Sequence, residues 1–365
     1  MITYAEALRR LMEKAVPVEG METVPLLYST HRVLAEDIVS PIAVPGWDNS
    51  QMDGYAVRAA ELAEASKDHP VVLPVSENVE VTPEGVCFKS PVREGAWVRR
   101  RGSDVPQGGV VLKKGARLTP AAIGMVASIG RAYVKVYRRL RVGIFFSGDE
   151  LVQPGEPLPP GGIYNSNRFM IRSLLQELGC EALDLGSVPD TLEATIEAFE
   201  SAAASADVIL TTGGMSVGEE DHIKPAVEAV GSLNVWRVRL KPGKPLAFGE
   251  VRGVPFIGCP GNPVAGFVVF LMMARPYLLR TMGLTDIDVK PMAVRADFDW
   301  LKPGDRQEFV RVRRNDEGGL DLYHTQNSQV LSSCAWADGL VDIPVGGTVR
   351  KGDMVSYYPF CQFFA

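Results

Sequence analysis

Apolar runs of strand length alternate with helix-like segments between residues 140 and 283, and this alternation constrains the fold more than any other feature. The first run, Leu140–Phe146, is uninterrupted, and the segment Asn167–Leu178 then carries its apolar side chains on one helical face. Gly179 supplies the residue type that commonly ends a helix. Such alternation is typical of a parallel sheet with helices on both faces. We therefore expect an α/β multidomain protein, whose central three-layer α/β/α domain, residues 140–287, contains a mostly parallel sheet.

The sequence on either side of this central domain has a different texture. Residues 39–104 are rich in proline, glycine and valine and contain short β-like runs, which predicts a small, shortened β-rich insert domain. Residues 288–365 contain alternating apolar and polar positions and a hairpin-type turn, which predicts a C-terminal β-barrel domain. The segments 1–38 and 105–139 remain, and we assign them to an N-terminal linker domain.

Composition and charge exclude several classes of protein. The formal net charge of -6 argues against broad binding to nucleic acids or to anionic membranes. The five cysteines are scattered and form no C-x-x-C pair, which argues against a disulfide framework or a structural zinc site. The longest apolar run, Val264–Ala274, is too short to span a bilayer, and Met1–Ala15 resembles an amphipathic helix. We expect a cytoplasmic protein with no nucleic-acid or membrane partner.

A glycine-rich loop, Thr211–Asp221, follows the apolar run Ala206–Leu210 and precedes a helix-like segment. A strand, a glycine turn and a helix start together gather backbone N–H groups that suit a phosphate or another anion. Glu220 and Asp221 close the loop, and carboxylates at this position suit a metal that bridges to the anion. An N-cap role for Asp221 stays open because it also opens a helix. The loop predicts an anionic ligand bound together with a cation.

Two further motifs follow predicted strands, where ligands of open α/β sheets bind. In Ser147–Glu150, the last carboxylate is a candidate ligand for a divalent cation, and the alternative is a turn with solvated acids. Cys259–Pro263 joins a strand to a helix, and no histidine motif accompanies the cysteine, which argues against a nucleophile. Asp190 opens a helix with Glu193 three residues later, and this pattern favours an N-cap.

The main basic element lies between residues 235 and 245. Arg237, Arg239 and Lys241 alternate, so they would share one face of a strand, and Lys244 follows across a Pro-Gly turn. Such a cluster suits a phosphorylated ligand. The alternative is the solvated face of an edge strand, where cations discourage aggregation. The two prolines stiffen the turn and favour the binding role.

Several motifs occur in the order found in the MoeA family of molybdopterin molybdenumtransferases, which includes the E domain of gephyrin. They are Asn49–Val57, Ser147–Leu151, Thr212–Gly218, Lys241–Pro245 and Pro260–Pro263. The resemblance runs from Ala5 to the predicted barrel. It implies an elongated homodimer of four-domain subunits that dimerise through the N-terminal domain and bind molybdopterin in the α/β domain. The implied reaction inserts molybdenum from molybdate into adenylylated molybdopterin with release of AMP and uses a divalent cation such as Mg²⁺.

The resemblance also implies roles for individual residues. The acids that it marks as catalytic are Asp53, Asp104, Glu150, Asp190 and Asp221, of which Glu150 and Asp221 would hold the metal. The residues that it marks as ligand-binding are Gly213, Gly214, Ser216, Arg237, Lys241, Lys244, Pro260, Pro263, Arg311 and Ser333. The implied partners, besides a second copy of the chain, are a molybdopterin adenylyltransferase and molybdoenzyme maturation factors.

One departure from the family pattern keeps a second function open. Relatives carry a Thr-Gly-Ala-x-x-Pro loop in the insert domain, and residues 58–101 contain no such motif. The alternative is therefore a non-catalytic molybdopterin-binding or scaffold paralogue. A third alternative, adenylyltransferase activity, is disfavoured by Thr212–Gly218 and by the additional β domains. A smaller departure is His31, where relatives usually have glycine.

Overall fold

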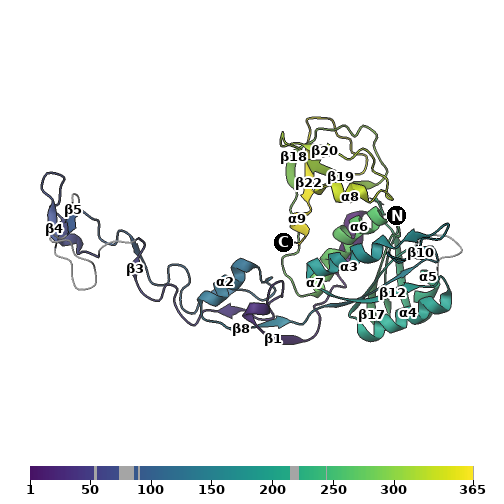
Figure 1. The fold of residues 1–365 in the computed structure, drawn as a ribbon, viewed down its shortest axis with the longest axis horizontal. Helices are drawn as coiled ribbons and strands as arrows, with labels where there is room; N and C mark the ends of the chain where they lie inside the picture. The colour runs from purple at the N-terminus through teal and green to yellow at the C-terminus, as the bar shows by residue number, and fades with distance from the viewer. Residues whose placement is uncertain (53–55, 74–85, 89–90, 214–221, 244, 365) are drawn as a thin grey trace. The chain divides into compact units, whose positions relative to one another are not determined.

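The computed structural model describes residues 1–52, 56–73, 86–88, 91–213, 222–243 and 245–364 (Figure 1). The chain divides into two compact units. The larger unit consists of residues 1–36, 114–119 and 133–365, and the smaller one of residues 37–113 and 120–132. The division into four domains stays a prediction.

The centre of the larger unit is a six-stranded mixed sheet. From one edge to the other its strands are β12 (Glu181–Val188), β9 (Arg141–Ser147), β13 (Val208–Thr212), β17 (Val254–Cys259), β16 (Pro245–Val251) and β14 (Gly231–Arg237). The first four run parallel, and β16 and β14 are antiparallel to their neighbours. The expected parallel sheet is thus present, with two antiparallel strands added at one edge.

Helices cover both faces of this sheet, as the sequence predicts. On one face lie α3 (Ser166–Leu178) and the run α6 (Pro263–Val269), a π-helical turn (Phe270–Ala274) and α7 (Arg275–Thr281); on the other lie α4 (Leu192–Ser205) and α5 (Ile223–Val230). Within β9, Ile144 and Phe146 join the first core and Phe145 joins the second. Successive strand side chains point to opposite faces, so one buried strand contributes to both cores.

The helical run Pro263–Thr281 forms the centre of the first core. At 19 residues it is long and apolar enough to cross a membrane, and 83% of its most apolar window is buried inside the protein. The run is longer than the apolar segment that the sequence suggests, because the helix continues through the π-helical turn into α7. Arg275, 4% exposed, donates hydrogen bonds to the carbonyls of Ile287 and Phe363, so its charge is accommodated within this core.

A second sheet occupies the C-terminal part of the larger unit. Its strands are β15 (Leu240–Lys241), β19 (Gln307–Arg314), β21 (Gly339–Ile343), β22 (Met354–Pro359) and β18 (Met292–Arg295), and β20 (Leu320–Leu322) pairs with β19. The hairpin between β19 and β20 is confirmed. An isolated bridge from Ala296 to Leu320 connects the end of β18 to β20. A closed barrel stays a prediction.

Strand β15 comes from the central region of the chain but belongs to this second sheet. Leu240 pairs with Gln307 and Lys241 with Glu308, in parallel register. This pairing brings the turn that follows β15 and the start of β19 together. It therefore brings residues of the C-terminal part to the edge of the central domain.

The N-terminal segment adds a helix and a small ladder to the larger unit. Helix α1 (Tyr4–Met12) is capped by Thr3 and confirms the amphipathic helix expected there. Strand β1 (Met21–Pro25), followed by the 3-10 turn η1 (Leu26–Tyr28), pairs with β8 (Tyr133–Tyr137). Arg138 then binds both carboxylate oxygens of Asp207 at 2.6 and 2.7 Å, which fixes the entry to the central sheet.

The smaller unit contains short two-stranded ladders in its described part. They are β2 (Ile38–Val39) with β7 (Val110–Leu112), β3 (Asn49–Ser50) with β6 (Val98–Arg99), and β4 (Val71–Leu73) with β5 (Val86–Phe88). The turn η2 (Ala59–Leu62) and the helix α2 (Pro120–Ser128), with proline at its first position, complete it.

Candidate functional site

A cavity of about 1100 Å³ lies at the carboxyl ends of β9, β13 and β17. The short pair β10 (Leu151–Val152) and β11 (Ile163–Tyr164) lines it on the side of α3. The turn after β15 and the segment Gln326–Gln329, which precedes α8 (Ser332–Trp336), line it from the C-terminal sheet. The position agrees with the expectation that ligands of open α/β sheets bind beyond the carboxyl ends of the strands.

Backbone contacts hold the ends of β13 and β17 together at the floor of this cavity. The amide of Gly213 donates to the carbonyl of Cys259 at 3.1 Å. A Cβ atom on Gly261 would lie 3.2 Å from the Cα of Gly213, so this close approach favours glycine at position 261. Nδ2 of Asn167 donates to the carbonyl of Gly261 at 2.7 Å and to Oγ1 of Thr212 at 3.3 Å. Asn167 therefore ties α3 to both strand ends.

Among the predicted acids, Glu150 lines the cavity and is exposed. It follows β9 through Gly148, whose φ of 151° is unusual for residues with a side chain. A Cβ atom on Gly148 would come within 2.7 Å of Oε2 of Glu150, so the carboxylate lies over the glycine backbone. The missing side chain at position 148 provides the space that this carboxylate occupies.

Asp190 has a different role from the N-cap that the sequence suggests. Thr191 caps α4, because its Oγ1 accepts a hydrogen bond from the amide of Ala194. One oxygen of Asp190 accepts a hydrogen bond from Oγ of Ser147 at 2.7 Å, and its amide donates to Asp149 at 3.0 Å. The half-buried Asp190 thus connects the ends of β12 and β9 beside the cavity, without lining it.

The basic residues do not share the face of one strand, which corrects the expectation. Strand β14 ends at Arg237, and Ile2 then forms hydrogen bonds with the backbone of Arg237 and Arg239. Arg237 and Arg239 are exposed and do not line the cavity. Lys241 lines it, because β15 joins the C-terminal sheet at this edge. Nζ of Lys241 lies 2.9 Å from Oε2 of Glu308.

Arg311 and Ser333 lie beneath the cavity lining. Arg311 is 1% exposed, and its Nη2 donates to the carbonyl of Asn327 at 3.3 Å. The side chain of Gln326 accepts a hydrogen bond from the amide of Arg311 at 2.8 Å and donates to its carbonyl at 3.2 Å. Burial lowers the pKa of the Arg311 guanidinium to about 10. The two residues hold the segment that lines the cavity.

Sequence reasoning missed the residues that the C-terminal part contributes to this cavity. They are Arg306, Gln326, Asn327, Ser328 and Gln329. The run of four polar residues before a helix is the sequence signal that points to them. Oγ of Ser328 accepts a hydrogen bond from Asn262, and its carbonyl accepts one from the amide of Val264, so this run also fixes the start of α6. Pro260 and Pro263 line the cavity nearby, and their role in ligand binding stays a prediction.

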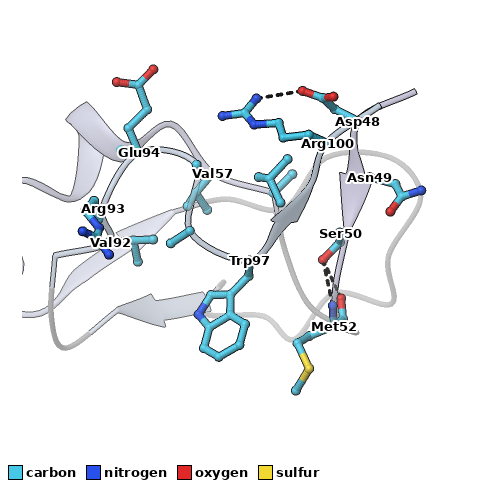
Figure 2. A pocket seen from close by; sticks show the side chains of 15 residues that line it. Asp48, Asn49, Ser50, Met52, Val57, Val92, Arg93, Glu94, Trp97 and Arg100 are labelled. Carbon is cyan, nitrogen blue, oxygen red and sulfur yellow. Dashed lines mark hydrogen bonds and ion pairs between the residues drawn. The ribbon is translucent and has the colours of Figure 1, made fainter. Parts of the chain in front are cut away.

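The smaller unit contains a second cavity, of about 750 Å³ (Figure 2). Asp48 lines it and accepts hydrogen bonds from the amide of Arg101 and the side chain of Arg100, both at 2.7 Å. These contacts hold the pKa of Asp48 below its usual value. The predicted Asp104 is exposed in the same unit and does not line this cavity.

Five predicted site residues lie outside the described part of the chain. They are Asp53, Gly214, Ser216, Asp221 and Lys244. Within the described ranges, no group of three or more His, Cys, Asp or Glu side chains gathers into a metal site. Mg²⁺ is commonly held by one or two carboxylates together with phosphate oxygens and water, and the exposed Glu150 carboxylate fits such a role.

Family models match almost the whole chain. Residues 2–89 and 71–130 match the MoeA N-terminal region (domain I and II), residues 143–280 match a probable molybdopterin binding domain, and residues 293–360 match the MoeA C-terminal region (domain IV). A Haemophilus influenzae protein named molybdopterin molybdenumtransferase is 34% identical, and the match covers 99% of this chain and 99% of the other. The chain belongs to the MoeA family.

Other family members agree with this result. A Bacillus subtilis molybdopterin molybdenumtransferase is 31% identical over 95% of this chain and 91% of its own length. The crystal structure of a MoeA protein from Pyrococcus horikoshii superimposes with a TM-score of 0.82 at 27% identity and covers 99% of this chain and all of the other. The resemblance inferred from the motifs is confirmed.

Proposed function

We propose that this chain is a molybdopterin molybdenumtransferase of molybdenum cofactor biosynthesis. It would bind adenylylated molybdopterin in the cavity at the carboxyl edge of the central sheet and insert molybdenum from molybdate with release of AMP. The observation that carries the proposal is the convergence of three family motifs on one cavity: Glu150 from the first, Gly213 from the glycine loop and Pro260–Pro263 from the third. These motifs are far apart in the sequence.

The residues that line the cavity suit an anionic, flat ligand. Gly213 and Gly261 lie close together and have no side chains. The floor of the cavity therefore exposes backbone atoms that a ligand can contact directly. Arg306 supplies positive charge, together with Lys241 in its ion pair with Glu308, and the side-chain amide of Asn327 supplies hydrogen-bonding groups. Attack by water or by a molybdate oxygen on the phosphoanhydride breaks the bond to AMP, which leaves as an anion.

Glu150 is the described carboxylate that would hold Mg²⁺, together with Asp221. When bound there, the cation would polarise the phosphoanhydride and offset the charge that develops on the leaving phosphate. Asp190 and Ser147 would keep the loop after β9 in place, because their hydrogen bond joins two strand ends next to Glu150.

The remaining expectations form part of the same proposal. Asp53 and Asp104 would contribute acids from the smaller unit, and Gly214, Ser216 and Lys244 would complete the ligand contacts. The enzyme would act in the cytoplasm as a homodimer of four-domain subunits with a C-terminal barrel. Its substrate would come from a molybdopterin adenylyltransferase, and its product would pass to molybdoenzyme maturation factors.

A second candidate function is molybdopterin binding without turnover. It is favoured by an interruption in the family pattern: the N-terminal family model matches in two pieces that overlap between residues 71 and 89. The segment without the Thr-Gly-Ala-x-x-Pro loop contains this overlap. A chain that lacks this loop would retain affinity for the intermediate and fail to release AMP.

One assay separates the two functions. The purified protein is mixed with adenylylated molybdopterin, molybdate and Mg²⁺, and AMP is measured by chromatography. We expect AMP release from the wild type and a loss of about 10²-fold or more for Glu150→Gln, because a charged ligand to the cation is removed. Glu197→Gln, an exposed acid on α4, is the matched control. Binding of the intermediate without AMP release by the wild type would instead support the second function.

A further inference from the structure

The cavity at the central sheet has few charged side chains in its described lining. They are Glu150, Lys241 and Arg306. A ligand with phosphate or molybdate oxygens needs cations that are not already neutralised by the protein. The partners of Lys241 and Arg306 therefore decide which of the two is available.

Lys241 is paired inside the protein. Its Nζ lies 2.9 Å from Oε2 of Glu308, whose side chain is 7% exposed. The other carboxylate oxygen of Glu308 packs against the backbone at Gly304, where a Cβ atom would approach it to 2.5 Å. The buried Glu308 carboxylate has little freedom to leave the ammonium group, so much of the Lys241 charge is compensated before a ligand arrives.

Arg306 differs from Lys241 in its acidic partner. Among the described residues, the carboxylate that pairs with its guanidinium is that of its neighbour Asp305, at 3.6 Å and with an 84% exposed side chain. An exposed pair at this distance contributes little energy. Nη1 of Arg306 also donates to the carbonyl of Leu240 at 3.4 Å, and this neutral partner adds no compensating charge.

The backbone on either side of Arg306 is fixed. The carbonyl of Gly304 accepts a hydrogen bond from the amide of Gly346 at 2.9 Å, and the amide of Gln307 donates to the carbonyl of Arg239 at 3.0 Å. The side chain itself is 27% exposed and lines the cavity. A guanidinium on a fixed backbone starts near the cavity, so less freedom is lost on binding than for an arginine on an unanchored loop.

We propose that Arg306 binds a tetrahedral oxyanion of the ligand, with Lys241 as a structural cation beside it. The proposal rests on the proposed function, and it names a binding residue that the motifs did not mark. Two sources have the required chemistry, the phosphate of the adenylate and molybdate itself. The planar guanidinium donates two parallel hydrogen bonds to either one, a geometry that a lysine does not reproduce.

Binding measurements on the intact protein test this without turnover. Molybdate alone and AMP alone are titrated calorimetrically into the wild type, Arg306→Gln, Arg306→Lys and Arg313→Gln. Arg313 is the matched control, since it is an exposed arginine of β19 that does not line the cavity. We expect Arg306→Gln to lower the affinity for one of the two anions by about tenfold or more, which is the loss typical of a charged hydrogen bond. Arg306→Lys should recover only part of the affinity, and Arg313→Gln should bind as the wild type does.

The affected anion identifies the source: weaker molybdate binding assigns Arg306 to the metal oxyanion, and weaker AMP binding assigns it to the adenylate. Wild-type affinity of Arg306→Gln for both anions overturns the inference, as does a wild type that binds neither. The proposed function is judged separately by AMP release. If the wild type releases no AMP but binds an anion that Arg306→Gln binds more weakly, the proposed function is overturned and the inference stands.

Discussion

Nε of Arg311 donates a hydrogen bond to Oγ of Ser333 across 3.2 Å, and both residues are buried. The hydroxyl of Ser333 in turn donates a hydrogen bond to the carbonyl of Val330 at 2.7 Å. The segment Gln326–Gln329, which lines the cavity, is thus supported from below. Arg311 and Ser333 are predicted ligand-binding residues, and in this structure they contact each other and the supporting backbone.

Replacement of Arg311 by alanine should therefore destabilise the protein as well as reduce ligand binding. We expect the free energy of unfolding to fall by about 3 kcal/mol, because a cavity forms and the carbonyl of Asn327 loses its donor. Urea denaturation followed by fluorescence measures this, with Arg313→Ala as the exposed control. A variant that keeps wild-type stability but loses molybdate affinity would instead indicate direct contact with the ligand.

The ion pair between Lys241 and Glu308 gives a second prediction. Lys241→Met leaves a buried carboxylate without its cation, so we expect a loss of about 2 kcal/mol in unfolding free energy, less than for a fully buried pair because Lys241 is 41% exposed. Glu308→Gln in the same chain should restore much of the loss. A double-mutant cycle from urea denaturation measures the coupling, and simple addition of the two single effects would contradict the pairing.

The close approach of Gly213 and Gly261 leads to a third prediction. Gly261→Ala adds a Cβ atom 3.2 Å from a backbone atom, so the two strand-end loops must separate slightly. We expect a KM for adenylylated molybdopterin that rises about tenfold, while the unfolding free energy changes by about 1 kcal/mol or less. Gly124→Ala, where a Cβ atom would enter open space, is the control and should leave KM unchanged. An unchanged KM for Gly261→Ala would show that the floor does not contact the ligand.

His31 gives a prediction on pH. It adopts φ 63°, and partial desolvation of its ring together with the neighbouring charge of Arg117 lowers its pKa. The folded protein therefore binds its proton less readily than the unfolded chain does, so this contribution to stability is present above about pH 6.5 and is lost as the pH falls below it. His31→Asn keeps a residue that tolerates positive φ but removes the titration. We expect the loss of unfolding free energy between pH 7.5 and 5.5 to be smaller in the variant, and an equal loss would contradict the assignment.

The sequence alone determined the central layers and the position of the cavity. Leu140–Phe146 reads as a strand because it is apolar throughout, and residues within it serve both cores. Gly179 ends α3 with a φ of 89°, as its residue type indicates. Local burial and local dihedral preference depend on short stretches of sequence, so both features could be predicted. The motif order likewise identified the family.

Only the tertiary structure decided which distant residues share the cavity. The alternation in residues 237–241 predicts one strand, but Leu240 and Lys241 pair with β19 instead and leave Arg237 outside. That long-range pairing brings Arg306 to the cavity and gives Lys241 a buried partner in Glu308. Periodicity reports how a segment is buried but not which remote strand accepts its hydrogen bonds, since that choice depends on packing across the whole unit.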